Sequence, residues 1–416
     1  MRTFLLWWVS LFAANFLSAQ RECRSFEYEK QLIQIDPSLE ASHRSVENFM
    51  LLRESSHSSF SARTEGAKTI TIPVIVHILY HYPGENISDD LVKSQLSALN
   101  RDFRKLNPDT SQISTAFKSL AADCGIEFKL ATVDAGGRAT TGIIHKYTPI
   151  TKWSMDDKIK FSSEMGDDAW DAKSYLNIWV GTMDRIIGYS SMPGDPATKD
   201  GVVIANTVFG ITNSGIYNQG RTAVHETGHW LGLRHLWGDA DCGDDGVADT
   251  PKQQTFTRGC PSTVRVSCGN GPNGDMYMDY MDFTNDDCLV MFTEGQKQKM
   301  LALFEPGGPR YSILTSNGLG IPTIEQIPLP DACPQWLHVK IFPNPVTSEL
   351  AINLEYDTRW LGKELQVINI TGQVELKVTI TSKIQKLDVS KLKPGIYFIR
   401  AEKNGEKMLQ KFVKLQ

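Results

Sequence analysis

Near the middle of the chain the sequence reads His225-Glu226-Thr227-Gly228-His229-Trp230-Leu231-Gly232-Leu233-Arg234-His235. On a helix, His225 and His229 lie one above the other on the same face, so both can bind one metal ion. Glu226 can then take a proton from a water molecule at that ion. Gly232 allows the helix to end, and the chain can turn to supply His235 as a third ligand. Three protein ligands leave a fourth position open, which predicts a catalytic zinc site.

The extended form of the motif carries more weight than its first five residues. A short HExxH pattern also arises by chance in amphipathic helices, but here three of the chain's nine histidines fall within residues 225–235. A set of solvated or core histidines is the alternative interpretation. The extended motif resembles the metzincin clan of metallopeptidases. That resemblance implies an α+β fold, with a twisted mixed sheet, helices and an irregular lower half.

A second segment narrows the resemblance to one family. The chain reads Met281-Asp282-Phe283-Thr284-Asn285-Asp286-Asp287-Cys288 and then Phe292-Thr293-Glu294-Gly295-Gln296. With the histidine motif, these segments resemble the pappalysin family. The resemblance implies a methionine turn beneath the metal, for which we prefer Met281 over Met278. Many members carry a tyrosine two residues later, where this chain has Phe283. Stabilisation of the oxyanion would then rest on the zinc itself, or on Tyr280 or Tyr277.

Length and charge set broad limits. The chain has 416 residues and a net charge of -5, which suits two or three domains and gives no electrostatic reason to expect nucleic acid. Residues 1–19 place Arg2 before an apolar run and end in Ser18-Ala19, the pattern of a secretory signal peptide. No other apolar run approaches the length of a transmembrane helix. We therefore expect an exported protein without a membrane span.

Export implies an oxidising environment, so the seven cysteines are expected to form disulfides. Four of them, Cys242, Cys260, Cys268 and Cys288, follow the histidine motif and allow three pairings. The pappalysin resemblance implies Cys242–Cys268 and Cys260–Cys288. Closing each loop would contribute on the order of 3 kcal/mol, and so would hold an irregular segment that has little apolar pattern of its own.

Cys23 lies just after the signal peptide, at the start of a charged, serine-rich stretch over residues 20–65. This stretch lacks apolar periodicity and is interpreted as a pro-segment. In related zinc peptidases a thiolate from the pro-segment occupies the open metal position, and Cys23 is the candidate for that latency role. The alternatives are a free thiol or a disulfide with Cys124 or Cys333.

Alternating strands and helices fill the expected catalytic domain, residues 66–315. β-branched runs predict strands over 69–78, 126–133, 176–180 and 202–204. Ser88 is a helix start that precedes an apolar face. The metal-binding helix is expected at about 219–232, and a last helix at about 294–304.

Five aspartates fall within residues 238–251, and hard carboxylate oxygens on a glycine-rich loop suit calcium. The preferred ligands are Asp245 and the backbone oxygens near Ala248 and Thr250, with Asp244 and Asp249 as alternatives. The pappalysin resemblance favours calcium, although the spacing is not that of an EF-hand. A solvated acidic loop is the other interpretation.

Asp287 bears on specificity. In some pappalysin-like enzymes this position lines the pocket just after the scissile bond. A buried carboxylate there would favour arginine or lysine in the substrate through charge-assisted hydrogen bonds. A surface aspartate or a calcium ligand are the alternatives.

The C-terminal part changes character. Residues 316–337 are interpreted as a linker, and residues 338–416 hold seven short alternating segments that predict a small β-sandwich. Phe342-Pro343-Asn344-Pro345 and Leu392-Lys393-Pro394-Gly395-Ile396-Tyr397 resemble the C-terminal sorting domain of the type IX secretion system of Bacteroidetes. This implies export through the outer membrane by that machinery; a carbohydrate-binding or adhesion module is the alternative.

Together these features predict a secreted zinc endopeptidase, made as a zymogen, that acts on proteins or peptides outside a Gram-negative cell or on its outer surface. Zinc is the expected cofactor, with calcium as a second ion. The rival hypothesis is a surface adhesion or binding protein with a non-catalytic metal site. Glu226 argues against that rival, because a binding protein has no need of a general base.

Overall fold

The computed structural model describes residues 23–57, 69–324, 339–354, 360–403 and 406–416. The chain forms two compact units, Met1–Glu325 and Gln326–Gln416, which we treat separately. The expected signal peptide and Cys333 lie outside the described residues.

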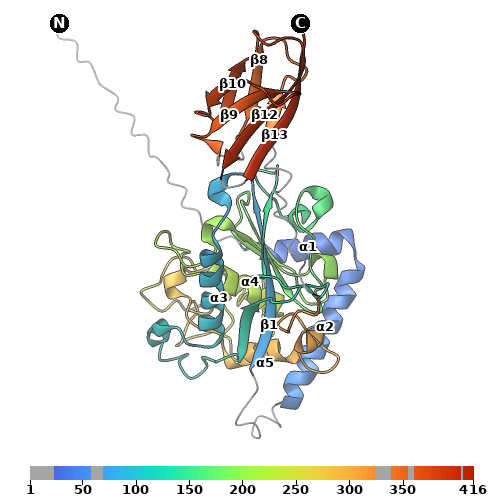
Figure 1. The fold of residues 1–416 in the computed structure, drawn as a ribbon. Coiled ribbons are helices and arrows are strands. Elements are labelled where there is room, and N and C mark those ends of the chain that lie inside the picture. The colour runs from blue at the N-terminus through green and yellow to red at the C-terminus, as the bar shows by residue number, and fades with distance from the viewer. Residues whose placement is uncertain (1–22, 58–68, 325–338, 355–359, 404–405) are drawn as a thin grey trace, which may run out of the picture. The chain divides into compact units, whose positions relative to one another are not determined.

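A six-stranded sheet forms the centre of the first unit (Figure 1). Its strand order is β2-β1-β4-β6-β5, and β3 pairs with the second half of β1. All pairs are parallel except β5, which runs antiparallel to β6 at the edge. The bounds are β1 Ile70–Tyr80, β2 Ile126–Leu130, β3 Ile143–Tyr147, β4 Leu176–Gly181, β5 Gly188–Ser190 and β6 Val202–Ala205.

Burial explains the long first strand. β1 is almost wholly buried, as its β-branched sequence predicts for a strand covered on both faces. The four strands expected from sequence are all present, whereas β3 and β5 were not expected. β5 has three residues and two of them are small or polar, so it carries no apolar alternation.

Three helices of the first unit have clear sequence causes. α3 (Asp89–Phe103) begins at Ser88, whose hydroxyl accepts a hydrogen bond from the backbone N–H of Leu91. α5 (Glu294–Ala302) begins with a capping box at Thr293. The histidine helix is α4 (Arg221–Trp230), which contacts α3, β5 and β6 and is shorter at both ends than expected.

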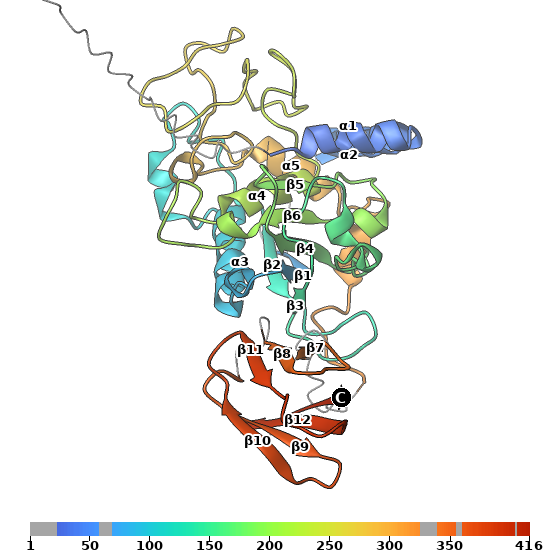
Figure 2. The ribbon, with the colours of Figure 1, turned by 90° about the horizontal axis from the view of Figure 1, so that it is seen from above.

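The amino-terminal stretch is the main departure from expectation. It forms two helices, α1 (Ser25–Ile35) and α2 (Ser38–His57), which lie side by side (Figure 2). α1 contacts β5 and α2 contacts α5. The buried residues of α1 are Ser25, Tyr28 and Leu32, which recur at intervals of three and four on one face of the helix. Only two of them, Tyr28 and Leu32, are large and apolar, so the stripe that packs on the sheet is short.

Residues 231–293 have little regular structure, as expected. Their backbone is held by two disulfides, Cys242–Cys268 and Cys260–Cys288, which are the pairs that the family resemblance implied. Short 3-10 turns occur elsewhere at Pro83–Glu85, Pro108–Gln112, Lys158–Lys160, Ser162–Glu164, Ala197–Lys199, Asn206–Val208, Asp286–Cys288 and Tyr311–Thr315. Residues expected to begin the linker still pack on this unit, because the N–H of Thr132 donates to the carbonyl of Gly318.

The second unit contains the seven strands that the sequence predicts. They form two sheets, with orders β10-β9-β12-β13 and β11-β8-β7, around a core that includes Trp360 and Phe412. Its strands are β7 Lys340–Phe342, β8 Glu349–Asn353, β9 Glu364–Asn369, β10 Val374–Thr379, β11 Ile384–Asp388, β12 Gly395–Lys403 and β13 Glu406–Lys414. Among the described residues of the whole chain, no helix is long and apolar enough to cross a bilayer.

Candidate metal centre

α4 presents its two histidines on one face, and the chain then turns back to bring a third beside them. Gly232 has φ of +82°, a left-handed conformation that suits glycine and ends the helix. The N–H of Leu233 donates to the carbonyl of Gly228, which closes the turn. His235 follows this turn and is buried like His225 and His229.

The three Nε2 atoms converge on one point. His225 Nε2 lies 3.1 Å from His229 Nε2 and 3.3 Å from His235 Nε2, and the last two atoms are 3.1 Å apart. A tetrahedral ion with metal–nitrogen bonds of about 2.0–2.1 Å would place its ligand atoms at nearly this spacing. The donor set therefore fits a single transition-metal ion.

The other ring nitrogen fixes the protonation of each histidine. His225 Nδ1 lies 2.7 Å from the carbonyl of Tyr280, and His229 Nδ1 lies 2.8 Å from that of Leu233. A carbonyl only accepts, so Nδ1 carries the proton and Nε2 is left with a free lone pair. Burial and the neighbouring His235 also lower the pKa of His229 to about 3. Neutral imidazoles with converging lone pairs need a cation between them.

Asp239 holds the third histidine. Its Oδ1 lies 2.5 Å from His235 Nδ1, so this ring pairs with a carboxylate. Such partners orient a ligand ring and raise its basicity. From sequence, Asp239 is one of five aspartates in the acidic loop, and its position four residues after the last histidine is the signal that sets it apart.

Glu226 lies beside the same point and is fully buried. Its Oε2 accepts a 2.8 Å hydrogen bond from the hydroxyl of Ser25 and lies 3.4 Å from Cys23 Sγ. The carboxylate is therefore in place to exchange a proton at the metal position, but in this structure the amino-terminal stretch covers it.

Cys23 completes the group. Its Sγ lies 3.4 Å from His229 Nε2, and Cys23 with His225, His229 and His235 forms a cluster whose ligand atoms all lie within 4.8 Å of one another. Cys23 and Cys124 are both buried thiols, not a disulfide. Burial and the Glu226 carboxylate raise the pKa of Cys23, so a cation beside it is required to favour the thiolate.

Met281 lies beneath α4. An added Cβ at Gly228 would lie 2.5 Å from Met281 Sδ, so the sulfur packs directly against the helix backbone. The N–H of Asp282 donates to the carbonyl of Asp279 and closes a tight turn that contains Met281. Met278 is also buried, but its carbonyl accepts from Val290, outside that turn. The geometry favours Met281 as the turn methionine.

Phe283 follows the turn and contacts the metal centre with its ring. The ring centroid lies 4.9 Å from that of His235 and 5.0 Å from that of Trp237. Tyr280 instead packs against Phe292, with the Arg221 guanidinium 5.7 Å from its ring centroid. Within the described residues, the side chains of Tyr280 and Tyr277 make no hydrogen bond or ring contact with the three histidines. The structure therefore does not support either tyrosine as the oxyanion donor.

Asp287 is exposed, in contrast to the buried carboxylate that the specificity hypothesis assumed. Its Oδ1 accepts a 2.6 Å hydrogen bond from Gln219 Nε2. The preceding Asp286 is buried and accepts from the backbone N–H groups of Gln219 and Arg221, so it fixes the start of α4. Asp287 remains open to a substrate side chain.

Two carboxylates of the acidic loop accept hydrogen bonds from protein groups, one within the loop and one on α5. Asp245 accepts from the hydroxyl of Thr250 at 2.8 Å, and Asp249 accepts from the N–H of Gly295 at the start of α5. Lys299 donates to the carbonyl of Asp245 at 3.1 Å. Burial raises the pKa of Asp245 to about 6. Within the described residues, groups of three or more potential ligands are found at the histidine centre and not at this loop.

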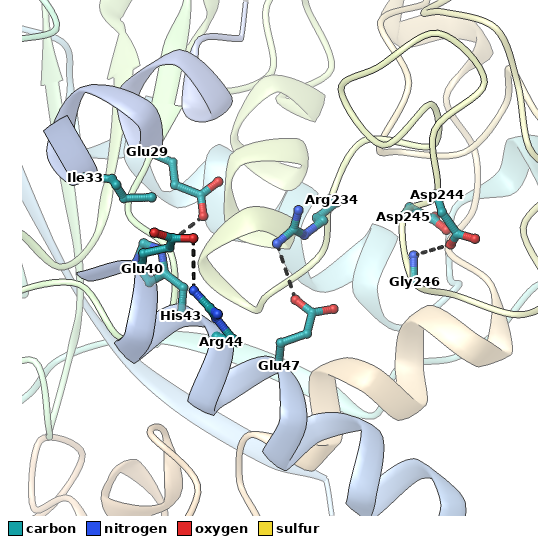
Figure 3. A pocket seen from close by; sticks show the side chains of 10 residues that line it. All are labelled: Glu29, Ile33, Glu40, His43, Arg44, Glu47, Arg234, Asp244, Asp245 and Gly246. Atoms are coloured by element: carbon teal, nitrogen blue, oxygen red, sulfur yellow. Dashed lines mark hydrogen bonds and ion pairs between the residues drawn. The ribbon is translucent and has the colours of Figure 1, made fainter. Parts of the chain in front are cut away.

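The amino-terminal helices meet the catalytic surface next to this loop. Glu47 on α2 lies 3.5 Å from Arg234, the residue before the last histidine (Figure 3). Glu47 also lies 3.2 Å from the buried Lys299. His43 lies 2.7 Å from Asp195. Ion pairs therefore hold helix α2 on the catalytic unit at three places: Arg234 beside the last histidine, Lys299 on α5, and Asp195.

Comparison with known proteins agrees with this geometry. Residues 160–305 match the family model described as pregnancy-associated plasma protein-A, and residues 340–415 match the secretion system C-terminal sorting domain. An extracellular metalloprotease of Verticillium alfalfae is 31% identical over 247 residues, which cover 56% of this chain and 75% of that protein.

Solved structures show the same relationship. Mature mirolysin of Tannerella forsythia, in complex with a cleaved peptide, is 43% identical, with a TM-score of 0.59; the match covers 60% of this chain and 96% of that one. Promirolysin of the same organism is 39% identical, with a TM-score of 0.65, covering 71% and 97%. The sorting domain and the extracellular relatives mark the chain as secreted. It belongs to the pappalysin family of metallopeptidases, within the metzincin clan.

Proposed function

We propose that the chain is a zinc endopeptidase that hydrolyses peptide bonds in proteins and is made as a zymogen. The observation that carries the proposal is the convergence of three imidazole nitrogens, 3.1–3.3 Å apart, beside a buried carboxylate. Neutral imidazole is a preferred zinc ligand, and three protein ligands leave a position for the reaction.

The residues divide the chemistry between them. His225, His229 and His235 would hold the ion through Nε2, and zinc, when bound, supplies the Lewis acidity that polarises the scissile carbonyl and lowers the pKa of a water molecule. Glu226 would take the proton of that water and deliver it to the leaving amine. Asp239 would orient His235.

Latency would come from the amino-terminal stretch, proposed as a pro-segment over residues 20–65. Cys23 would fill the open ligand position, and Ser25 engages the general base directly. Removal of this stretch would release the catalytic domain, proposed as residues 66–315. The promirolysin structure supports the proposal because it is a proform whose match covers 71% of this chain.

Two further features bear on substrate and export. We propose that Asp287 favours arginine or lysine just after the scissile bond, because its exposed carboxylate could accept hydrogen bonds from a cationic side chain. The proposed sorting domain, residues 338–416 after a linker over 316–337, would be recognised by the type IX secretion machinery. A peptide library cut without preference for basic residues would exclude the specificity role of Asp287.

Calcium stays a prediction with little structural support. Asp245, with the backbone oxygens of Ala248 and Thr250, would have to exchange its present hydrogen bonds for the ion. Titration of metal-free protein with Ca²⁺ in a calorimeter tests this prediction. If the binding heat of the wild type does not exceed that of an Asp245→Asn variant, the calcium hypothesis is wrong.

The general base gives the sharpest test of the whole proposal. Activated Glu226→Ala protein should be folded and should bind one equivalent of zinc, while casein hydrolysis falls by about 10²–10⁴-fold. Glu164→Ala, which changes an exposed glutamate, is the matched control. Undiminished hydrolysis by Glu226→Ala, or wild-type protein without stoichiometric zinc, would overturn the assignment.

A further inference from the structure

Tyr28 of the amino-terminal stretch fills a pocket in the catalytic unit. Its side chain is buried, and its ring lies 4.8 Å from that of Tyr189 on β5. The surrounding cluster draws Leu79, Trp153, Ile159, Trp179, Tyr189 and Val203 from the catalytic unit. Leu32 and Leu39 of the amino-terminal helices cover it from outside. The walls therefore belong to the catalytic unit and the lid to the stretch that we propose is removed.

The floor of this pocket matches a phenolic hydroxyl. The hydroxyl of Tyr28 donates to Asp157 at 2.8 and 2.9 Å, and it accepts from Lys160 Nζ at 3.2 Å. Burial and the Asp157 carboxylate raise the pKa of Tyr28, so the phenol keeps the proton that it donates. Donor and acceptor capacity of one hydroxyl are both satisfied, which an unsubstituted phenyl ring could not achieve.

The floor is held together without Tyr28. Asp157 lies 3.0 Å from Nζ of both Lys160 and Lys199. Lys160 is fully buried and also donates to the carbonyl of Lys199 at 2.8 Å. Because these contacts all lie within the catalytic unit, the pocket should keep its shape when Tyr28 leaves.

β5 lies between the pocket and the catalytic carboxylate, and its successive residues Gly188 and Tyr189 face opposite sides of the sheet. Gly188 touches Glu226, since an added Cβ there would lie 3.0 Å from its side chain. Tyr189, the next residue, forms a wall of the pocket. β5 pairs with β6 on one side, and on the other it bridges Cys23, with the N–H of Arg24 donating to the carbonyl of Gly188. The side chains of an extended peptide that pairs with this edge also alternate between the two faces, so one can face the metal centre while a neighbouring one enters the pocket.

We propose that release of the amino-terminal stretch uncovers a subsite of the mature enzyme that binds a tyrosine side chain of the substrate. The inference rests on the proposed peptidase function and adds a substrate feature to it. A site built to pair a buried hydroxyl rejects the analogue that lacks it, because its polar groups are then left unpaired.

A substitution series tests the subsite in the activated full chain. A peptide cut at one bond is changed to tyrosine, phenylalanine or alanine at each position near that bond, and kcat/KM is measured. At one position we expect tyrosine to exceed phenylalanine by about tenfold. Asp157→Asn should bring that ratio close to one. Asp156→Asn, an adjacent exposed carboxylate, should keep the ratio.

Two results would overturn the subsite: a tyrosine-to-phenylalanine ratio near one at every position, or a ratio that Asp157→Asn leaves unchanged. If Asp157→Asn protein does not fold, inhibition of the wild-type enzyme by a peptide of residues 24–35, which lacks Cys23, decides the matter. The Tyr28→Phe form of this peptide should inhibit about tenfold more weakly, and equal inhibition would refute the subsite. A chain that cleaves no peptide, alanine series included, would instead contradict the peptidase proposal.

Discussion

The hydroxyl of Ser25 donates a 2.8 Å hydrogen bond to Oε2 of Glu226, the carboxylate proposed as general base. Oγ of Ser25 also accepts a 2.9 Å hydrogen bond from the N–H of Ser190 on β5. Ser25 thus ties the edge strand to the base, two residues after the thiol that faces the metal position. The amino-terminal stretch blocks the two reacting centres separately, the ligand position through Cys23 and the base through Ser25.

Replacing Ser25 should therefore weaken latency even when Cys23 is intact. A hydrogen bond to a charged group is worth about 1.5–3 kcal/mol, so we expect Ser25→Ala to raise the basal activity of the full-length chain by at least about tenfold. Initial rates on a quenched peptide, with processing followed on gels, measure this effect. Ser38→Ala, which alters an exposed serine of the same stretch, should remain as latent as wild type. Equal latency of Ser25→Ala and wild type would assign inhibition to Cys23 alone.

The carboxylate of Asp239 should set how tightly the metal is held. Asp239→Asn keeps the shape of the side chain but removes the charge that faces His235 Nδ1, and such partners typically contribute 10- to 100-fold in affinity. We expect a loss of about that size, measured by zinc competition with a chromophoric chelator. Asp241→Asn in the same loop is exposed and serves as the control. An unchanged affinity in Asp239→Asn would show that the pair only positions the loop.

Met281 and Met278 can be separated by two measurements. Both are buried, so truncation of either to alanine should cost about 2–5 kcal/mol of unfolding free energy. Met281 alone packs on Gly228 beneath the histidines, so Met281→Ala should also weaken zinc binding, whereas Met278→Ala should not. Met165→Ala, at a side chain that is 54% exposed, controls for the chemistry of the substitution. Stronger loss of zinc in Met278→Ala would reverse the assignment of the turn.

The parts of the fold that the sequence predicts are those with local causes. β1 and the seven C-terminal strands carry uninterrupted or alternating apolar runs, and α3 and α5 begin at serine or threonine caps. The spacing of the three histidines also predicts that their side chains converge, because a helix and the turn after it bring them together. Each of these signals lies within a few neighbouring residues, where propensity and periodicity operate.

The missed features depend on partners far away in the sequence. α1 buries Tyr28 and Leu32 against a surface made largely of residues more than a hundred positions away in the sequence. An apolar stripe of two residues is too short to predict a helix by its periodicity. β5 is an edge strand of three residues, and its bridge to Cys23 joins residues far apart in the sequence. The specificity hypothesis assumed a buried Asp287, with a surface aspartate as an alternative. Burial at that position depends on how the disulfide-linked segment folds, which the sequence pattern alone does not specify.

His43 should make the binding of α2 to the catalytic unit depend on pH. Burial works to lower its pKa, but the hydrogen bonds and charges of Asp195 and Glu29 outweigh burial and raise the pKa to about 9. Because the pKa of His43 is raised in the folded chain, its contact stabilises the docked helix to the full extent when the pH is below the unfolded pKa of about 6.5. That contribution is lost as the pH rises through about 9. Limited proteolysis of the full-length chain should therefore release the amino-terminal stretch faster at high pH.

Two variants isolate this contribution from other groups that titrate at high pH. His43→Gln should be released more readily than wild type at neutral pH and should lose most of the dependence on pH between 7 and 10. His145→Gln removes a histidine that pairs with Asp89 away from α2, so it should follow the wild-type profile. If His43→Gln and wild type show the same pH profile, the attachment of α2 rests on the ion pairs of Glu47 with Arg234 and Lys299 instead.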